Sequence, residues 1–299
     1  MKLSVVVPCF NEAPSINQFY DNLIEVLKKE KITYEIIFVD DGSHDDTKNN
    51  IIELNKKDKN VKMISFSRNF GKESAMLAGL KYTSGDYVSI MDADMQHSPS
   101  KMIEMYKRLL EDSNYDSICA YKSSREDEGG IKRTLTAIFY RFNNIVSDVK
   151  LLPGASDFRV FKKTVRDAII LLPEKTRFLK GIFSWVGFNT IYVPYTPEKR
   201  LYGKTNWSLI KLLRYSLGGI VSFSTLALKL LGVCSIPLFL IGLLNFVLLG
   251  NLSNRTIILF SSIIILWLGI IAIYISRIYS NILGRPNYIV KEEIGFDKK

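Results

Sequence analysis

The chain contains few of the residues and motifs that mark several common protein classes. Its 299 residues include three cysteines and two histidines, and the odd number and wide spacing of the cysteines argue against a disulfide framework or a short-spaced metal site. His44 and His97 have no partner pattern for a catalytic triad or a zinc site, so both are expected on the surface. Neither common glycine-rich phosphate motif is present, because no Gly-x-Gly-x-x-Gly follows the first predicted strand and no Gly-x-x-x-x-Gly-Lys-Ser/Thr occurs. The N-terminus shows no signal-peptide pattern. The cysteine count and spacing favour a reducing compartment.

Charged residues are missing from two long stretches near the end of the chain. Between Lys229 and Arg255 lie 25 uncharged residues, and between Arg255 and Arg277 another 21. As a helix the shorter run would be about 31 Å long, which matches the roughly 30 Å hydrocarbon core of a bilayer. Two buried core helices are the alternative, but the 21-residue run has no polar face. The sequence therefore predicts two transmembrane helices within 227–280.

Basic residues flank these predicted spans on one side. The net charge is +10, and several Lys and Arg lie before the first span and after the second, whereas the connecting loop has Arg255 alone. The positive-inside rule then predicts a multi-pass protein of the inner (cytoplasmic) membrane with the preceding domain, both termini and a tail at 281–299 on the cytoplasmic side. An amphipathic helix predicted at 206–226 would lie in the headgroup region or pack on the domain. We attribute the positive charge to phosphate and membrane contacts, with no nucleic acid as partner.

Strands and helices alternate in the first part of the chain. The β-branched run Leu3–Val7 is typical of a buried parallel strand. Further strands are predicted at Glu35–Val39, Val61–Ser65 and Asp86–Met91, with helices between them at Ser15–Lys28, Asp46–Lys56 and Lys72–Tyr82. This order predicts an α/β fold with a doubly wound, mostly parallel sheet and right-handed crossovers. Ligands bind such sheets beyond the carboxyl ends of the strands.

Two acidic clusters are expected at that edge of the sheet. Asp40-Asp-Gly-Ser43 follows the second predicted strand, and Asp92-Ala-Asp94 follows the fourth. Carboxylates two residues apart can approach one hard cation, and Gln96 adds a neutral oxygen at the same spacing. Mg²⁺ or Mn²⁺ would fill its remaining positions with diphosphate oxygens and water. The alternative is an acidic loop that caps a helix before Ser98-Pro99.

A series of short motifs occurs in a fixed order along the chain: Pro8-Cys-Phe-Asn-Glu12, Asp40-Asp-Gly-Ser43, Ser67-Arg-Asn-Phe-Gly-Lys-Glu73, Gly85-Asp86, Met91-Asp-Ala-Asp-Met-Gln96 and Gly154-Ala-Ser-Asp-Phe-Arg159. The series resembles glycosyltransferase family 2, and within it the polyprenyl-phosphate glycosyltransferases related to dolichol-phosphate mannose synthase and the bactoprenol glucosyltransferases. The resemblance continues into the apolar runs and covers nearly the whole chain. It implies a GT-A glycosyltransferase domain at residues 1–205.

The resemblance also implies roles for residues in the first two motifs. Pro8, Phe10 and Glu12 would line the base and ribose pocket of a nucleotide. Asp41 would be the carboxylate partner of the base, since a carboxylate accepts hydrogen bonds from a base N–H or ribose hydroxyls. Alternatively, one of Asp40 and Asp41 would only cap the helix after Gly42-Ser43, and Asp41 is the favoured contact.

Further residues match positions for the metal, the acceptor and the chemistry. Asp92, Asp94 and Gln96 match metal ligands. Asp157 matches a proposed catalytic base, although it could instead orient the sugar or pair with Arg159. Four basic residues would bind acceptor phosphate or diphosphate: Arg125, Arg133, Arg200 and Lys204. Lys72, which could face phosphate or simply begin a helix, is not assigned to the site.

The function implied is inverting, metal-dependent transfer of one sugar from a nucleotide-sugar donor to polyprenyl (undecaprenyl) phosphate at the cytoplasmic face of the membrane. UDP-glucose or UDP-N-acetylglucosamine is the favoured donor, the membrane and the lipid phosphate are partners, and a homo-oligomer such as a tetramer is compatible with the relatives. A processive polysaccharide synthase and a non-catalytic membrane protein that binds nucleotide sugars are the alternatives. The Gln-x-x-Arg-Trp motif of the processive synthases is absent from this sequence.

Overall fold

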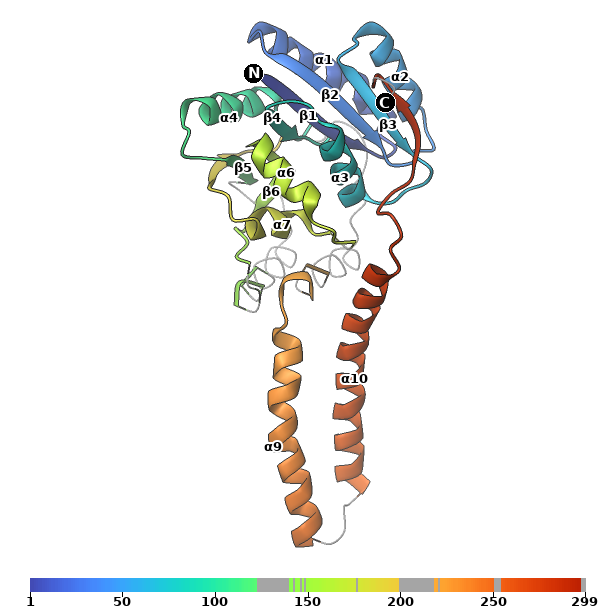
Figure 1. Ribbon diagram of the computed structural model, residues 1–299, viewed down its shortest axis with the longest axis vertical. Helices are drawn as coiled ribbons and strands as arrows, with labels where there is room; N and C mark the ends of the chain where they lie inside the picture. The colour runs from blue at the N-terminus through green and yellow to red at the C-terminus, as the bar shows by residue number, and fades with distance from the viewer. Residues whose placement is uncertain are drawn as a thin grey trace.

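One mixed sheet of eight strands organises the N-terminal part of the protein in the computed structural model (Figure 1). The structure describes residues 1–122, 140–141, 143–145, 147, 149–175, 177–198, 218–219, 221–249 and 254–296. The strands are β1 Lys2–Cys9, β2 Thr33–Asp40, β3 Val61–Phe66, β4 Tyr87–Ile90, β5 Ser117–Lys122, β6 Ala155–Lys162, β7 Thr190–Tyr195 and β8 Val290–Ile294. Their spatial order is β7-β5-β6-β4-β1-β2-β3-β8.

The first four strands form the predicted parallel core of this sheet. β1 pairs in parallel with both β2 and β4, and β2 pairs in parallel with β3. β6 is antiparallel to β4 and β5, and β8 is antiparallel to β3. The α/β fold class with a mostly parallel sheet is therefore confirmed. The carboxyl ends of β1, β2 and β4 lie at one edge, where the acidic motifs begin.

Helices cover both faces of the sheet (Figure 1). Their bounds are α1 Ala13–Lys29, α2 Thr47–Lys57, α3 Lys72–Tyr82, α4 Pro99–Glu111, α6 Lys163–Leu171, α7 Leu179–Trp185, α9 Leu226–Leu249 and α10 Asn254–Ile282. Successive side chains of a strand point to opposite faces. Accordingly, Val5 packs in the core formed with α1 and α4, whereas Val6 packs in the core formed with α3, α6 and α7.

Two long apolar helices, α9 and α10, extend side by side away from the sheet (Figure 1). Within the ranges described above, one stretch is long and apolar enough to cross a membrane, Phe260–Ile282 in α10. The apolar stretch of α9 is shorter, at Leu228–Leu244. Two transmembrane helices are expected within 227–280, and the span corresponding to α9 stays a prediction. Of the amphipathic helix predicted at 206–226, residues 206–217 lie outside the described residues.

The last described residues return to the sheet. β8 lies within the segment predicted as a tail at 281–299, and it pairs with β3 along the edge of the sheet. The rings of Phe66 and Tyr288 stack at 4.9 Å, and Ser67 N donates a hydrogen bond to Ile289 O at 3.0 Å. The chain that leaves α10 is thus tied to the same sheet from which the chain enters α9.

Candidate active site

The loops after β1 and β2 are joined by hydrogen bonds at the carboxyl edge of the sheet. Asn11 N donates to Ser43 Oγ at 3.0 Å, and His44 N donates to Asn11 Oδ1 at 2.9 Å. Glu12 N donates to Thr47 Oγ1 at 2.8 Å, so the start of α1 is held against the start of α2. The predicted nucleotide residues lie along this rim.

Each of the three predicted pocket residues has a defined place there. Pro8 is buried in β1 beside Val39 of β2, and Phe10 is half-buried with its ring 6.4 Å from that of His44. Glu12 directly precedes α1, and one of its carboxylate oxygens accepts a hydrogen bond from Ser15 Oγ at 3.1 Å. Exposed His44 agrees with the surface position predicted for it.

Asp40 and Asp41 differ in what they bind. Asp40 accepts hydrogen bonds from Ser43 N at 2.9 Å and Ser65 Oγ at 2.8 Å, whereas the residue that directly precedes α2 is Asp46. Asp41 is 3% exposed and accepts from Phe70 N at 2.6 Å and Gly71 N at 2.9 Å. Burial raises the pKa of Asp41 to about 6, although these two backbone hydrogen bonds oppose the shift. Asp41 therefore also holds the chain that enters α3.

Lys72, left outside the site by the sequence reasoning, lies at its centre. Its ammonium nitrogen is 2.7 Å from Asp92 Oδ1 and 3.0 Å from Asp157 Oδ2. The position of α3 makes this possible, because Gly79 lets the helix approach β1: a Cβ atom there would lie 2.2 Å from Val6 Cγ1. Burial would lower the pKa of Lys72, but the two carboxylates outweigh it and raise the pKa well above the usual value. Lys72 is therefore a cation that joins two predicted site residues.

The turn after β4 carries the predicted metal ligands. Asp94 is 8% exposed, and its Oδ1 accepts a hydrogen bond from Gln96 N at 3.1 Å. Met95 has a φ of 64°, in the left-handed region, which closes the turn tightly. Burial would raise the pKa of Asp92, but Lys72 and His97 hold it below its usual value. Asp92 is thus ionised, whereas Asp94 is nearly enclosed by the turn.

The prediction that His97 lies on the surface is wrong. The residue is 6% exposed, and its ring stacks on Phe158 with centroids 4.5 Å apart. Its Nδ1 accepts a hydrogen bond from Asp92 N at 3.1 Å, so the imidazole fixes the backbone of the acidic turn. Burial lowers the pKa of His97 despite the nearby Asp92. The aromatic partners come from distant strands, which is why local sequence did not reveal this position.

Asp157 is half-buried on β6, with one oxygen bonded to Lys72 and the other buried without a partner among the described residues. Its Oδ2 accepts from Lys72, and among the described residues Oδ1 has no hydrogen-bond partner. Burial would raise the pKa of Asp157, but Lys72 and Lys180 outweigh it and hold the pKa far below its usual value. The ion-pair partner of Asp157 is Lys72, in place of the Arg159 considered above. An ionised carboxylate with a spare oxygen can accept a hydrogen bond from a bound ligand.

Comparisons with known proteins agree with this arrangement. The model of the family described as glycosyl transferase family 2 matches residues 4–169. This chain belongs to glycosyltransferase family 2. It is 37% identical to a bactoprenol glucosyl transferase of Shigella phage SfX over 97% of this chain and 99% of that protein. The chain is a glycosyltransferase.

Solved structures show the same fold at low sequence identity. Mannosyl-3-phosphoglycerate synthase from Rubrobacter xylanophilus superposes with a TM-score of 0.51 at 17% identity, covering 77% of this chain and 74% of that one. Glucosyl-3-phosphoglycerate synthase from Mycobacterium tuberculosis, in complex with Mn²⁺, uridine diphosphate and phosphoglyceric acid, superposes with a TM-score of 0.50 at 19% identity, covering 74% and 76%. The GT-A fold expected for this glycosyltransferase is thereby confirmed.

The residues at the acidic turn fit a hard divalent cation of the kind expected in this family. Asp92 and Asp94 supply carboxylate oxygens and Gln96 an amide oxygen, and such ligands suit Mg²⁺ or Mn²⁺. Within the described ranges, no three Asp, Glu, His or Cys side chains converge on a common metal position. One or two carboxylates supplemented by substrate phosphates is the usual protein environment of Mg²⁺. The buried Oδ1 of Asp157 is a further oxygen in the same region.

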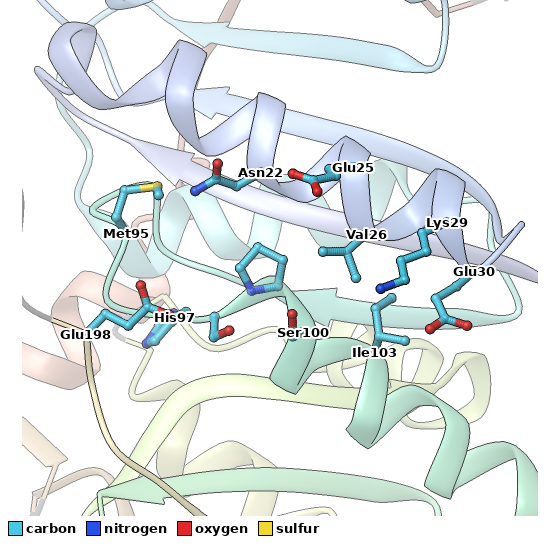
Figure 2. A pocket seen from close by; sticks show the side chains of 12 residues that line it. Asn22, Glu25, Val26, Lys29, Glu30, Met95, His97, Ser100, Ile103 and Glu198 are labelled. Atoms are coloured by element: carbon cyan, nitrogen blue, oxygen red, sulfur yellow. The ribbon is translucent and has the colours of Figure 1, made fainter.

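A cavity of about 390 Å³ lies beside the acidic turn, between α1 and the start of α4 (Figure 2). Met95 and His97 form one end of it, and Glu25, Glu30 and Glu198 contribute three carboxylates. Lys29 also lines it, and Glu30 pairs with Lys107 at 2.6 Å, so its charge alone does not decide what it binds. The predicted site residues that the structure describes do not line this cavity, which lies on the flank of the candidate site around Lys72.

The predicted acceptor residues of this glycosyltransferase, Arg125, Arg133, Arg200 and Lys204, lie outside the described residues. Of the cationic residues that the structure does describe, Lys72, Lys180 and Arg159 all lower the pKa of Asp157, and Lys72 has the largest effect. Lys72 could have been found from its place in the motif Ser67-Arg-Asn-Phe-Gly-Lys-Glu73, directly after a predicted strand end. Lys180 carried no such signal.

Proposed function

We propose that this glycosyltransferase transfers one sugar from a nucleotide-sugar donor to the phosphate of a polyprenyl phosphate, with inversion at the anomeric carbon. The observation that carries the proposal is the Asp92–Lys72–Asp157 cluster at the carboxyl edge of the sheet. It lies beside the loops expected to hold a nucleotide. The same chain carries the two apolar helices α9 and α10. Similarity over nearly the full length to a bactoprenol glucosyl transferase supports a lipid phosphate as the acceptor.

The reaction would place unusual demands on charge and few on a base. An oxygen of the acceptor phosphate attacks the anomeric carbon, the bond from that carbon to the donor diphosphate breaks, and the nucleoside diphosphate leaves with the electron pair. A phosphate monoester is already anionic at neutral pH, so no proton must be removed first. Asp157, whose pKa lies far below its usual value, would be a weak base. Its role is to position Lys72 and a sugar hydroxyl.

Cations are needed because two phosphate-bearing substrates repel one another. Mg²⁺ or Mn²⁺ held by Asp92, Asp94 and Gln96 would stabilise the charge of the departing nucleoside diphosphate. Lys72 already balances Asp92 and Asp157 in the protein alone. A structural relative in the same fold binds Mn²⁺ together with uridine diphosphate, which supports testing Mn²⁺ beside Mg²⁺.

The return of β8 to the sheet supports a helical hairpin in the membrane. A chain that crosses a bilayer once ends on the opposite side from its start. The segment after α10 pairs with β3 of the domain that precedes α9. If α10 spans the membrane, α9 must therefore span it too. The basic residues on both flanks then favour the cytoplasmic face for the domain and both termini.

UDP-glucose and UDP-N-acetylglucosamine are the donors we favour, and a processive synthase is the second candidate. Full-length similarity to a bactoprenol glucosyl transferase favours transfer of one sugar to a lipid over extension of a polysaccharide. The two differ in product: one sugar per lipid, or a series of lengths on one acceptor.

The test is transfer by the purified full chain in detergent. UDP-glucose, UDP-N-acetylglucosamine and GDP-mannose are each supplied with undecaprenyl phosphate and Mg²⁺ or Mn²⁺, and the extracted lipid is analysed by mass spectrometry. We expect one hexose or one N-acetylhexosamine per lipid from one donor. The transfer rate of Asp94→Asn should be at least about 100-fold below that of wild type. Asp21→Asn, on the exposed face of α1, should keep the wild-type rate. No lipid product from any donor would contradict the proposal, and a ladder of products would favour the synthase.

A further inference from the structure

A second cavity, of about 300 Å³, lies between α7, the strands β6 and β7 and residues 149–155. Three cationic side chains line it, from Lys150, Arg159 and Lys180. No carboxylate belongs to the described residues that line it. Apolar side chains, among them Leu151 and Phe183, form much of the remaining wall. The cavity thus combines positive charge with an apolar surface.

Arg159, one of the residues that line the cavity, is a buried cation. Its side chain is 4% exposed, and its guanidinium group lies 3.7 Å from the ring centroid of Phe183. One terminal nitrogen donates to Ser156 O at 3.0 Å, but among the described residues Nε has no hydrogen-bond partner. Its charge acts on Asp157, but that carboxylate forms its ion pair with Lys72, so Arg159 has no ion pair of its own among the described residues. Replacing a buried charge that lacks an ideal partner by an apolar side chain often stabilises a protein. A bound anion would compensate this charge.

Another buried arginine shows what a purely structural arrangement looks like. Arg166, 7% exposed on α6, donates to Asp167 Oδ1 and to the carbonyl and hydroxyl oxygens of Thr83. Its charge and its hydrogen bonds are both balanced within the protein. Arg159 leaves Nε without a hydrogen-bond partner among the described residues, and the carboxylate on which its charge acts, Asp157, is shared with Lys72 and Lys180. The cavity beside Arg159 can therefore accept a further anion.

The wall of the cavity also contacts the chain that enters the apolar helices. Gly181 of α7 lies against the ring of Phe223, since a Cβ atom on this glycine would be 2.4 Å from Cε2 of that ring. Ser147 Oγ, close to the opposite wall, donates to Phe223 O at 3.2 Å. Phe223 is three residues before α9 (Figure 1). A molecule with one end in the cavity would therefore have its other end near the base of α9.

We infer that this cavity binds the phosphate monoester head of an apolar chain, with Arg159 and Lys180 as its phosphate donors. The inference rests on the proposed function and deepens it, because it assigns the acceptor to residues that its motifs did not indicate. The planar guanidinium group suits bidentate contact with phosphate oxygens. Arg159 is two residues from Asp157 on β6, so both side chains leave the same face of the strand. Lys180 contributes to the low pKa of Asp157, which places the cavity and the site within reach of each other's charges.

Binding of a short, soluble acceptor analogue tests the inference without any sugar transfer. Citronellyl phosphate is titrated into the detergent-solubilised full chain by isothermal calorimetry, with inorganic phosphate and citronellol as separate arms. Arg159→Met should lower the affinity for citronellyl phosphate by about tenfold or more, because hydrogen bonds to charged groups are strong. Lys162→Met removes one positive charge from the same strand outside the cavity, where Lys162 pairs with Asp116; it should change affinity by less than about twofold. Citronellol should bind far more weakly than the phosphate.

Two further observations separate a failed inference from a failed fold or a failed function. Methionine can replace the arginine over Phe183, so Arg159→Met should melt at or above the temperature of the wild type; Arg159→Lys keeps the charge without the fork and should also bind more weakly. Unchanged affinity in both variants would overturn the inference, even if lipid-linked sugar is formed. Affinity that depends on Arg159 would uphold it even if no donor is used. Equal binding of inorganic phosphate would show a simple anion site and overturn the acceptor assignment.

Discussion

Replacing Lys72 with methionine removes the ammonium group that separates Asp92 from Asp157. The distances of 2.7 and 3.0 Å show a bridged arrangement of two carboxylates around one cation. Without it the two anions face each other, and burial then acts against both. Breaking a fully buried pair costs about 3–5 kcal/mol and an exposed one about 0.2–1 kcal/mol. The three side chains are 37%, 26% and 16% exposed, so a loss of about 2 kcal/mol is expected for Lys72→Met.

Thermal unfolding of the full chain in detergent measures this loss. About 2 kcal/mol corresponds to a fall of about 4–8 °C in Tm for a domain of this size. Lys101→Met, which removes a surface pair with Glu104 on α4, should change stability by less than about 0.5 kcal/mol. In the double variant Lys72→Met, Asp157→Asn the repulsion between the two carboxylates is relieved. Its loss of stability should therefore be smaller than the sum of the losses of the two single variants by at least about 0.5 kcal/mol.

The pH dependence of Lys72→Met provides an independent check. The folded pKa of Asp157 is depressed, so its contribution to stability is present above the unfolded pKa and disappears as pH falls through the folded value. The difference in stability between wild type and Lys72→Met should therefore be constant from pH 6 to 8 and shrink below about pH 4. A variant as stable as wild type, or strictly additive losses with Asp157→Asn, would refute the reasoning.

Two other variants test Asp41 and the returning strand. Burial raises the pKa of Asp41 to about 6, so the stability from its protonated form is present below about pH 4 and is lost as pH rises through 6. From about pH 4 to pH 6 the free energy of unfolding of Asp41→Asn should rise by about 2–3 kcal/mol relative to that of wild type, as measured by urea unfolding. A difference in stability that does not change with pH would contradict this. Tyr288→Ala removes the ring stacked on Phe66; it should cost about 1–2 kcal/mol and speed amide exchange in β3, and unchanged exchange would show that β8 is not held by this contact.

Much of the parallel core could be predicted because it is encoded locally. The run Leu3–Val7 is apolar and β-branched, and the helix that follows has an apolar stripe, so both elements and their order follow from periodicity. The acidic motifs come directly after strands, and the parallel arrangement then places them at one edge.

Contacts between distant segments could not be predicted in this way. Lys72 meets Asp157 across 85 positions of sequence, and no local pattern indicates that a lysine at a helix start will reach a carboxylate on an antiparallel strand. His97 has a polar side chain in a short turn, which favours exposure, but Phe158 and Tyr195 enclose it. The return of Val290–Ile294 to β3 also depends on the free edge of a sheet whose strand order is not visible in the sequence.

The sequence by itself thus determined the α/β class, the family resemblance, the acidic turn and the apolar runs, since each depends on residues close together in the chain. Tertiary structure decided the partners of those residues. Packing of α3 against β1 brings Lys72 between Asp92 and Asp157. Packing of α7 against β6 leaves Arg159 buried beside a cavity whose described lining residues include no acid. The physical reason is that electrostatic and steric interactions act through space, while sequence periodicity reports only the segment that carries it.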